Sequence, residues 1–249
     1  MAGEPEKRAE LPPSVALAWG RRPASGRGPR PGLSVERIVA AAVRVAEREG
    51  LAAVSMSRVA AELGSSPMSL YRHVASKDEL LLLMTDLPLE KPPVIDAAAD
   101  WRDRLSGWAH AYRTLLHRNP WVVRVPISGP PITPNNVAWF EAGLQALAGT
   151  ALTEDEKVAA VLLVSTHVRS DAQLVGDIEA AGSNSDNAAV LASYGEFLRA
   201  LIDPEEHPAL HRVVQAGVFD AQTTPDDSDF EFGLRTIVNG LETLMDSRS

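Results

Sequence analysis

Residues 55–77, which read SMSRVAAELGSSPMSLYRHVASK, constrain the fold more than any other stretch, because they predict two short helices joined by a tight turn. A serine of the opening SMS caps the first helix, since its hydroxyl accepts from backbone N–H groups of the first turn. Gly64 ends that helix, because glycine readily adopts the left-handed conformation. Ser66 caps the second helix, and Pro67 takes its first position, where a missing N–H costs nothing. This order of elements is a helix-turn-helix.

Two further helices are predicted to flank the motif. The first begins at the N-cap Ser34, carries an apolar stripe at steps of three and four residues, and ends at Gly50. The other begins at the N-cap Ser76 and continues through KDELLLLMTDL to the neighbourhood of Lys91. Two consecutive prolines after Lys91 end the segment. We therefore expect a helix-turn-helix domain over residues 33–90.

Five residues of the second helix make the motif specific. Leu70, Tyr71, His73 and Val74 fit the pattern L-Y-x-H-[FV], and Lys77 opens the next helix. With the preceding RVAAELG, this set resembles the DNA-binding domain of the TetR family of transcriptional regulators. The resemblance implies that the protein binds double-stranded DNA through this helix.

The predicted DNA contacts fall into two groups. Tyr71, His73 and Lys77 would donate to phosphate oxygens, as would the serines at the helix N-terminus. Arg72 could bind a guanine through two hydrogen bonds, and Met68 could contact a thymine methyl. The alternative is that Tyr71 and His73 only pack the small domain. The full set of predicted contacts is Ser57, Arg58, Ser65, Ser66, Pro67, Met68, Ser69, Tyr71, Arg72, His73 and Lys77.

Residues 1–32 are rich in Pro, Gly and charge and lack sustained periodicity, so we expect a flexible basic arm. Its segment RRPASGRGPRPG contains four arginines and no acid. These arginines would either enter the minor groove or belong to a solvated linker. The formal net charge of the chain is −9, but local fields decide which surface meets phosphate.

The composition of the chain narrows the classes of protein to which it could belong. The chain has no cysteine, which excludes disulfides, thiolate zinc sites and cysteine nucleophiles. Its first residues lack the apolar region of a signal peptide, and no apolar run is long enough to span a bilayer. We expect a cytoplasmic protein that does not contact a membrane.

The remaining residues, 91–249, are predicted to be helical, and the fold class is all-α. Helical patterns cover residues 101–118, 134–147, 153–178, 188–202 and 230–245, with one further turn at 208–215. Alternating β-branched strands and internal repeats are absent from the sequence. This half resembles the C-terminal domain of tetracycline repressors, so the resemblance covers Ser34 to Met245.

That resemblance implies an effector-binding and dimerisation domain. The long helix and the last helix would pack against their copies in a four-helix bundle, giving a twofold homodimer. Their apolar and small residues agree with close packing. They are Val158, Val161, Leu162, Ser165, Phe232, Gly233, Ile237, Gly240 and Leu244.

Large aromatic side chains with a few polar groups predict where an unknown small-molecule effector binds, although aromatics at helical spacing are also typical of a plain core. The candidates are Trp101, Trp108, Tyr112, Trp121, Arg124, Trp139 and His167. Tetracycline repressors carry a metal-coordinating histidine where this chain has RVPISGPPITP. A magnesium–tetracycline chelate is therefore not expected.

No metal site, cofactor or catalytic centre is expected. His207 and His211 lie four apart, but no third ligand of suitable geometry accompanies them. Phosphate-binding glycine loops and Ser-His-Asp arrangements are absent from the sequence. The favoured interpretation is a ligand-responsive homodimeric repressor that binds a palindromic operator and is not an enzyme. The alternative is an all-α ligand-binding or enzymatic dimer with a vestigial DNA reader.

Overall fold

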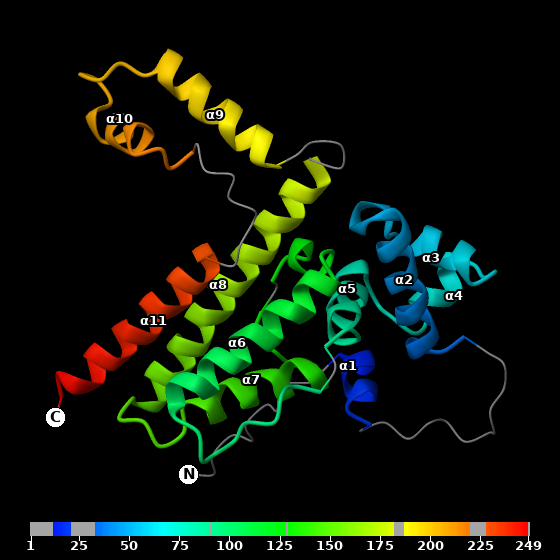
Figure 1. Cartoon of the computed structure of the whole chain (residues 1–249). Helices are drawn as coiled ribbons and strands as arrows, with labels where there is room; N and C mark the ends of the chain where they lie inside the picture. Colours follow the sequence, from blue (N-terminus) through cyan, green and yellow to red (C-terminus); the bar gives the residue numbers. More distant parts are fainter. Residues whose placement is uncertain are drawn as a thin grey trace, which may run out of the picture.

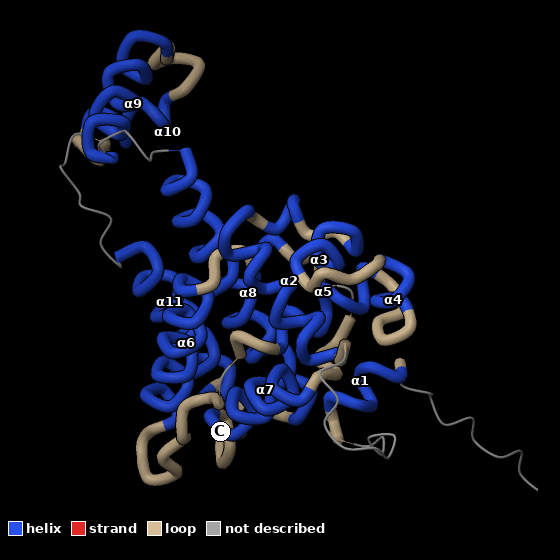
Figure 2. The backbone as a smooth tube through the Cα atoms, turned by 90° about the vertical axis from the view of Figure 1, so that its right-hand side faces the viewer, coloured by secondary structure: helices blue, strands red, loops and turns tan. Residues whose placement is uncertain are grey.

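A computed structural model describes residues 12–20, 33–89, 91–127, 129–181, 187–219 and 228–248. All regular elements in these ranges are helices, as Figure 2 shows, and the all-α prediction is confirmed. Within the described ranges, no helix combines the length and the apolarity needed to cross a membrane.

The helix-turn-helix consists of α3 (Met56–Glu62) and α4 (Pro67–Tyr71), packed under α2 (Val35–Glu49). Serine hydroxyls at the predicted N-caps accept backbone N–H groups at the start of each helix: Ser34 for α2, Ser55 for α3 and Ser66 for α4. A 3₁₀ turn, η1 (Leu51–Ala53), connects α2 to α3. The core between them is fully buried and consists of Ile38, Val45, Val54, Val59, Leu70 and Val74.

Helix α5 (Lys77–Asp86) completes this unit, and we call α2–α5 the reader domain. Ser76 caps α5 as predicted, by accepting from the backbone N–H of Glu79 at 3.0 Å. The helix ends at Asp86, earlier than the prolines after Lys91 suggested, and Pro88 follows its C-cap Leu87 without a backbone N–H that could continue the helix.

The C-terminal bundle consists of α6 (Trp101–Arg118), α7 (Pro134–Ala146), α8 (Glu154–Ala181) and α11 (Ser228–Asp246), with a short 3₁₀ turn η2 (Val122–Arg124). Helix α8 lies along both α6 and α11 (Figure 1). Gly143 permits the close approach of α7, since a Cβ there would lie 3.0 Å from Val161 and 3.2 Å from the Trp108 ring. Val161 is thus buried inside the subunit, whereas the sequence placed it on a dimer face.

Helices α9 (Asn187–Leu201) and α10 (Pro208–Gln215) form a hairpin that stands apart from the bundle in Figure 1. The short helix predicted at 208–215 is confirmed. The hairpin carries exposed apolar side chains, including Phe197 and Leu201, the latter 78% exposed.

The prediction of a flexible arm over residues 1–32 is wrong for Pro13–Ala18, which form the helix α1. Val15 is fully buried and Ser14 nearly so, and Leu17 packs against the main core. Six residues show too little periodicity to be recognised in a Pro- and Gly-rich context, and their order comes from tertiary contacts. The arginines of RRPASGRGPRPG lie outside the described residues.

Candidate nucleic-acid interface and effector site

Helix α4 presents one face to the core and another to solvent. Leu70 and Val74 are fully buried, and they fix the helix on the reader domain. Met68 is 69% exposed and Tyr71 is 46% exposed. Arg72, His73 and Lys77 are also exposed. The Tyr71 ring and the His73 imidazole are therefore available for contact, and neither side chain belongs to the buried core of the reader domain.

The turn before α4 brings polar groups to the helix N-terminus. Gly64 adopts φ 60°, and the backbone N–H of Ser65 donates to the Ala60 carbonyl at 2.9 Å, which closes the turn. The hydroxyls of Ser66 and Ser69 lie 2.9 Å apart. Together with the partial positive charge of the helix end, this arrangement suits a phosphate oxygen.

Arg58 differs from the other predicted DNA contacts because its guanidinium is already bound. It donates to Glu49 at 2.6 Å and to Glu62 at 3.2 Å, and Arg48 binds the same two carboxylates. Hydrogen bonds from Arg58 and then Arg48 lower the pKa of the Glu49 carboxyl to about 2. Residue spacing alone did not reveal this network, whose members come from α2 and α3. Ser57, one residue earlier, is exposed.

The charged side chains of the turn before α4, of α4 and of the residues up to Lys77 are all positive. Within the described residues, neither Arg72 nor Lys77 forms an ion pair. The sequence has no acid between Glu62 and Asp78, so the turn and α4 contain no negative side chain. The chain is acidic overall, yet this surface presents unneutralised cations.

The reader domain is fastened to the bundle by a buried carboxylate, which sequence reasoning missed. Oδ1 of Asp86, at the end of α5, accepts the backbone N–H groups of Asn135 and Asn136 at 3.0 and 2.9 Å. It also accepts the Asn136 side-chain amide at 3.2 Å. Thr133, the N-cap of α7, makes no side-chain cap bond, so a carboxylate from another domain caps α7.

Three of the seven effector candidates form one aromatic cluster. The ring of Trp108 stacks on Tyr112 with centroids 5.7 Å apart, and Trp139 lies 5.5 Å from Tyr112. The Trp108 indole N–H donates to the Trp139 carbonyl at 3.0 Å. We call Trp108, Tyr112 and Trp139 the aromatic cluster. It joins α6 to α7 and is packed closely by Gly143.

Three other effector candidates, Trp101, Trp121 and Arg124, make interactions different from those of the aromatic cluster. Trp101, the first residue of α6, has the Arg102 guanidinium over its ring at 4.9 Å. Trp121 is buried, and its indole nitrogen has no hydrogen-bond partner among the described residues. Arg124 is largely exposed and donates to Asp177 on α8 at 2.6 Å.

His167 joins α8 to α11. Its ring stacks on Phe230 at 5.1 Å, and Nε2 lies 3.0 Å from the Phe230 carbonyl oxygen. Gly233 permits this approach, because a Cβ there would overlap the imidazole. The structure therefore gives His167 a packing and hydrogen-bonding role between two helices and does not place it in the aromatic cluster.

A polar seam surrounds the same phenylalanine. Arg113 binds Asp171 at 2.6 Å, and Nε2 of His110 lies 2.6 Å from the Glu231 carboxylate. Burial opposes the charged form of His110, but hydrogen bonds to the Ser106 carbonyl and to Glu231 outweigh it, so the pKa of His110 is raised. This seam ties α6 to α8 and α11 by charge.

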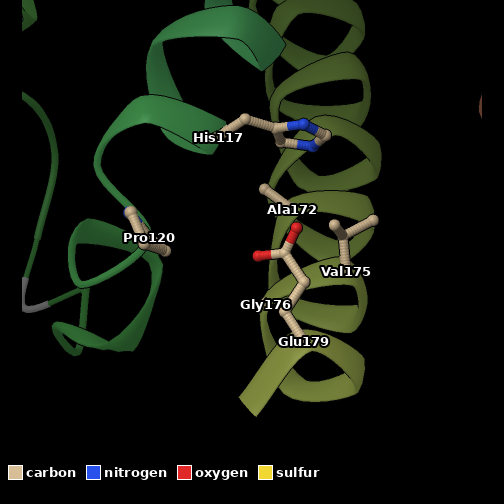
Figure 3. Close-up of a pocket in the computed structure, with 6 residues that line it drawn as sticks. All are labelled: His117, Pro120, Ala172, Val175, Gly176 and Glu179. Carbon is tan, nitrogen blue, oxygen red and sulfur yellow. The ribbon is translucent and has the colours of Figure 1, made fainter. Parts of the chain in front are cut away.

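A small cleft opens between the end of α6 and α8 (Figure 3). Its lining includes none of the seven effector candidates, although Pro120 precedes Trp121. In Figure 3 the carboxylate of Glu179 extends from α8 into the gap. The lining residues are His117, Pro120, Ala172, Val175, Gly176 and Glu179.

Metal binding finds no support in the ranges that the structure describes, where no group of three His, Cys, Asp or Glu could hold an ion. His207 and His211 lie at the start of α10, where the backbone N–H of His211 donates to the His207 carbonyl.

Comparison with known proteins agrees with these two units. The pattern described as "Bacterial regulatory proteins, tetR family" matches residues 38–84, which hold α3, α4 and most of α2 and α5. The pattern described as "Tetracyclin repressor-like, C-terminal domain" matches residues 93–245. The chain belongs to the TetR family. It is a helix-turn-helix transcriptional regulator, and both parts of the sequence resemblance are confirmed.

Two individual relatives match most of the chain, and a third matches a little more than half of it. The HTH-type transcriptional repressor DrrR1 of Streptomyces coeruleorubidus is 35% identical over 247 residues, which covers 94% of this chain and 87% of the relative. ActR of Streptomyces coelicolor in complex with actinorhodin superposes with a TM-score of 0.72 at 26% identity, covering 88% of this chain and all of ActR. BioQ with its double-stranded DNA operator has a TM-score of 0.51 at 26% identity, covering 57% and 85% of the two chains.

Proposed function

We propose that the protein is a homodimeric repressor that binds a palindromic operator through α4 and is released by a small molecule bound in the C-terminal bundle. The observation that carries the proposal is the exposed, acid-free surface of α4, held on the reader core by Leu70 and Val74. BioQ, whose structure contains its operator, and DrrR1, a named repressor, support this assignment.

On this surface, Tyr71, His73 and Lys77 bind phosphates, and Met68 and Arg72 face base edges. Ser65, Ser66, Pro67 and Ser69 place the helix N-terminus against the backbone. Ser57 contacts the neighbouring phosphate. Arg58 contributes indirectly, because its ion pairs with Glu49 and Glu62 hold α3 on α2.

Dimerisation covers the apolar surface that α8 and α11 leave exposed. Leu162 and Phe232 are each 63% exposed, and Val158 and Leu244 are also exposed. A Cβ at Gly240 would meet nothing within 4 Å in the subunit, which leaves room for a neighbouring helix. A twofold pair through this surface presents two copies of α4, as a palindrome of two half-sites requires.

The effector binds between α6, α7 and α8, where it displaces contacts of the aromatic cluster. ActR, which is similar throughout, binds actinorhodin in its own structure. The buried Trp121 indole N–H has no protein acceptor among the described residues, so an effector oxygen could accept from it. Release of operator by a hundredfold would require about 2.7 kcal/mol of coupling between the two sites.

The first test is selection of random duplexes by the purified dimer at fixed salt. Enrichment of a palindrome supports the proposal and supplies the operator. If a folded dimer enriches no sequence, the repressor assignment is refuted and the vestigial-reader alternative gains support.

Two variants then separate phosphate from base contacts. Lys77→Ala should weaken binding to every duplex alike and lower the slope of log K against log salt by about 1.8 per dimer, since each phosphate contact contributes about 0.9. Arg72→Ala should relax base preference at one position of each half-site and lose about 1–3 kcal/mol of discrimination there. The α4 assignment fails if both variants bind and discriminate like the parent protein.

A further inference from the structure

Helix α1 lies outside both regions that match the family, because those regions begin at residues 38 and 93. It is therefore not part of either matched family region. Figures 1 and 2 both place α1 beside the reader domain and close to α7.

One side of α1 is bonded to the reader domain. The hydroxyl of Ser14 donates to the Glu79 carboxylate in the first turn of α5. The other oxygen of that carboxylate accepts the backbone N–H of Ala75, in the segment that connects α4 to α5. Glu79 thus links α1 to the chain that leaves the recognition helix.

The other end of α1 is bonded to the C-terminal bundle. The indole N–H of Trp19 donates to the carbonyl oxygen of Ile132 at 2.7 Å. Ile132 directly precedes Thr133, the N-cap of α7. Val15, fully buried, lies between these two attachments. A helix of six residues spans only about 9 Å, so these bonds hold the reader and the bundle at close range.

We propose that α1 is an interdomain strap, which holds the reader domain against the start of α7 and so fixes the orientation in which α4 meets DNA. The α5–α7 cap formed by Asp86 is a second link between the same helices. A fixed orientation removes freedom that DNA binding would otherwise have to remove, and this raises operator affinity.

The strap is tested with a matched pair of variants in the full-length protein. Val15→Asp places a charge on the buried face and detaches α1, whereas Ala18→Asp places the same charge on an exposed position of the same helix. Both variants change the net charge equally, so any difference between them reflects the attachment of α1. Circular dichroism and molecular-mass measurements determine whether each variant is a folded dimer before it is compared.

The first measurement uses hydrogen exchange without DNA. Val15→Asp should raise exchange of the backbone amides in α5 and in the first turn of α7 about tenfold, because these segments then open locally. Ala18→Asp should leave both segments unchanged. Equal exchange in the two variants overturns the inference.

The second measurement uses the selected operator duplex, and this arm alone rests on the proposed function. Val15→Asp should bind the operator about tenfold more weakly than Ala18→Asp, which corresponds to about 1.4 kcal/mol. Trp19→Phe, which keeps an aromatic ring and removes the N–H donor, should weaken binding by a smaller factor. This conservative variant decides the question if Val15→Asp fails to fold.

The outcomes are distinguishable. If exchange rises in Val15→Asp without any loss of affinity, α1 is a packing element and the inference is wrong. If the parent protein selects no operator, the proposed function fails. The exchange comparison then still decides whether α1 joins the domains.

Discussion

Replacing Asp86 measures how strongly the reader domain is tied to the bundle. Three hydrogen bonds from α7 converge on Oδ1 of Asp86, at 2.9 to 3.2 Å, and a fourth, from the Asn135 side-chain amide, goes to the Asp86 backbone carbonyl at 2.9 Å. Asp86→Ala removes the three bonds to the carboxylate together, keeps the bond to the backbone carbonyl, and leaves the first-turn N–H groups of α7 without their acceptor. Loss of a helix cap costs about 1 kcal/mol, and hydrogen bonds to a charged group cost about 1.5–3 kcal/mol when one partner is removed. We expect a total of about 3 kcal/mol per subunit.

Asp86→Asn separates the hydrogen bonds from the charge. An asparagine can keep a carbonyl oxygen at the Oδ1 position, so all three bonds can persist. What it loses is the attraction between a carboxylate and the positive end of α7, which is worth about 1 kcal/mol where partly buried. The order parent, Asn and then Ala is therefore expected, with the larger step between Asn and Ala.

The assay is urea unfolding at one fixed protein concentration, because the stability of a dimer depends on concentration. Asp78→Ala, an exposed acid in the first turn of the same helix, is the control and should cost at most about 1 kcal/mol, the contribution of a surface acid at a helix start. If Asp86→Ala is no more destabilising than Asp78→Ala, the Asp86 cap does not tie the domains. If Asn and Ala variants are equally unstable, charge and not hydrogen bonding accounts for the tie.

Three further perturbations test other parts of the structure. Gly233→Ala should cost about 1–3 kcal/mol of unfolding free energy, because its Cβ would overlap the His167 ring; Gly107→Ala, which has open space, should not. The parent should be more stable than His110→Gln, because Glu231 favours the charged form of His110. This difference in unfolding free energy should be full below about pH 6.5 and vanish as the pH rises through the raised pKa of His110. A difference that grows with pH refutes this reasoning. Leu162→Glu should yield monomers by sedimentation, and an intact dimer would place the interface elsewhere.

The sequence predicted the reader domain well because its signals are local. Ser34, Ser66 and Ser76 each cap a helix through a bond to a residue three positions later, and Gly64 needs only its own backbone freedom. Such contacts are encoded within a few residues. The exposed face of α4 follows from the same spacing that buries Leu70 and Val74.

Long-range contacts account for what the sequence did not reveal. Asp86 caps a helix that begins 48 residues later, and Ser14 binds a carboxylate 65 residues away. Neither spacing has a periodic signal. Arg58 is a predicted DNA contact because it lies on the helix before the turn, and the sequence did not reveal its partner Glu49, which is brought to it only when α3 packs on α2. His167 is a predicted effector contact because it is a polar residue within an apolar helix, and the sequence did not reveal its partner Phe230, which lies 63 residues away.

The two ends of α5 explain how the bundle could control the reader. Glu79 at the start of α5 binds the α4–α5 connection and α1, and Asp86 at its end binds α7. A ten-residue helix is roughly 15 Å long, so a tilt of about 10° about Asp86 moves its other end by roughly 2.6 Å. Hydrogen bonds to bases tolerate only a few tenths of an ångström. A small shift of α7, on which Trp139 of the aromatic cluster sits, would thus be enough to displace α4 from its bases while each domain stays intact.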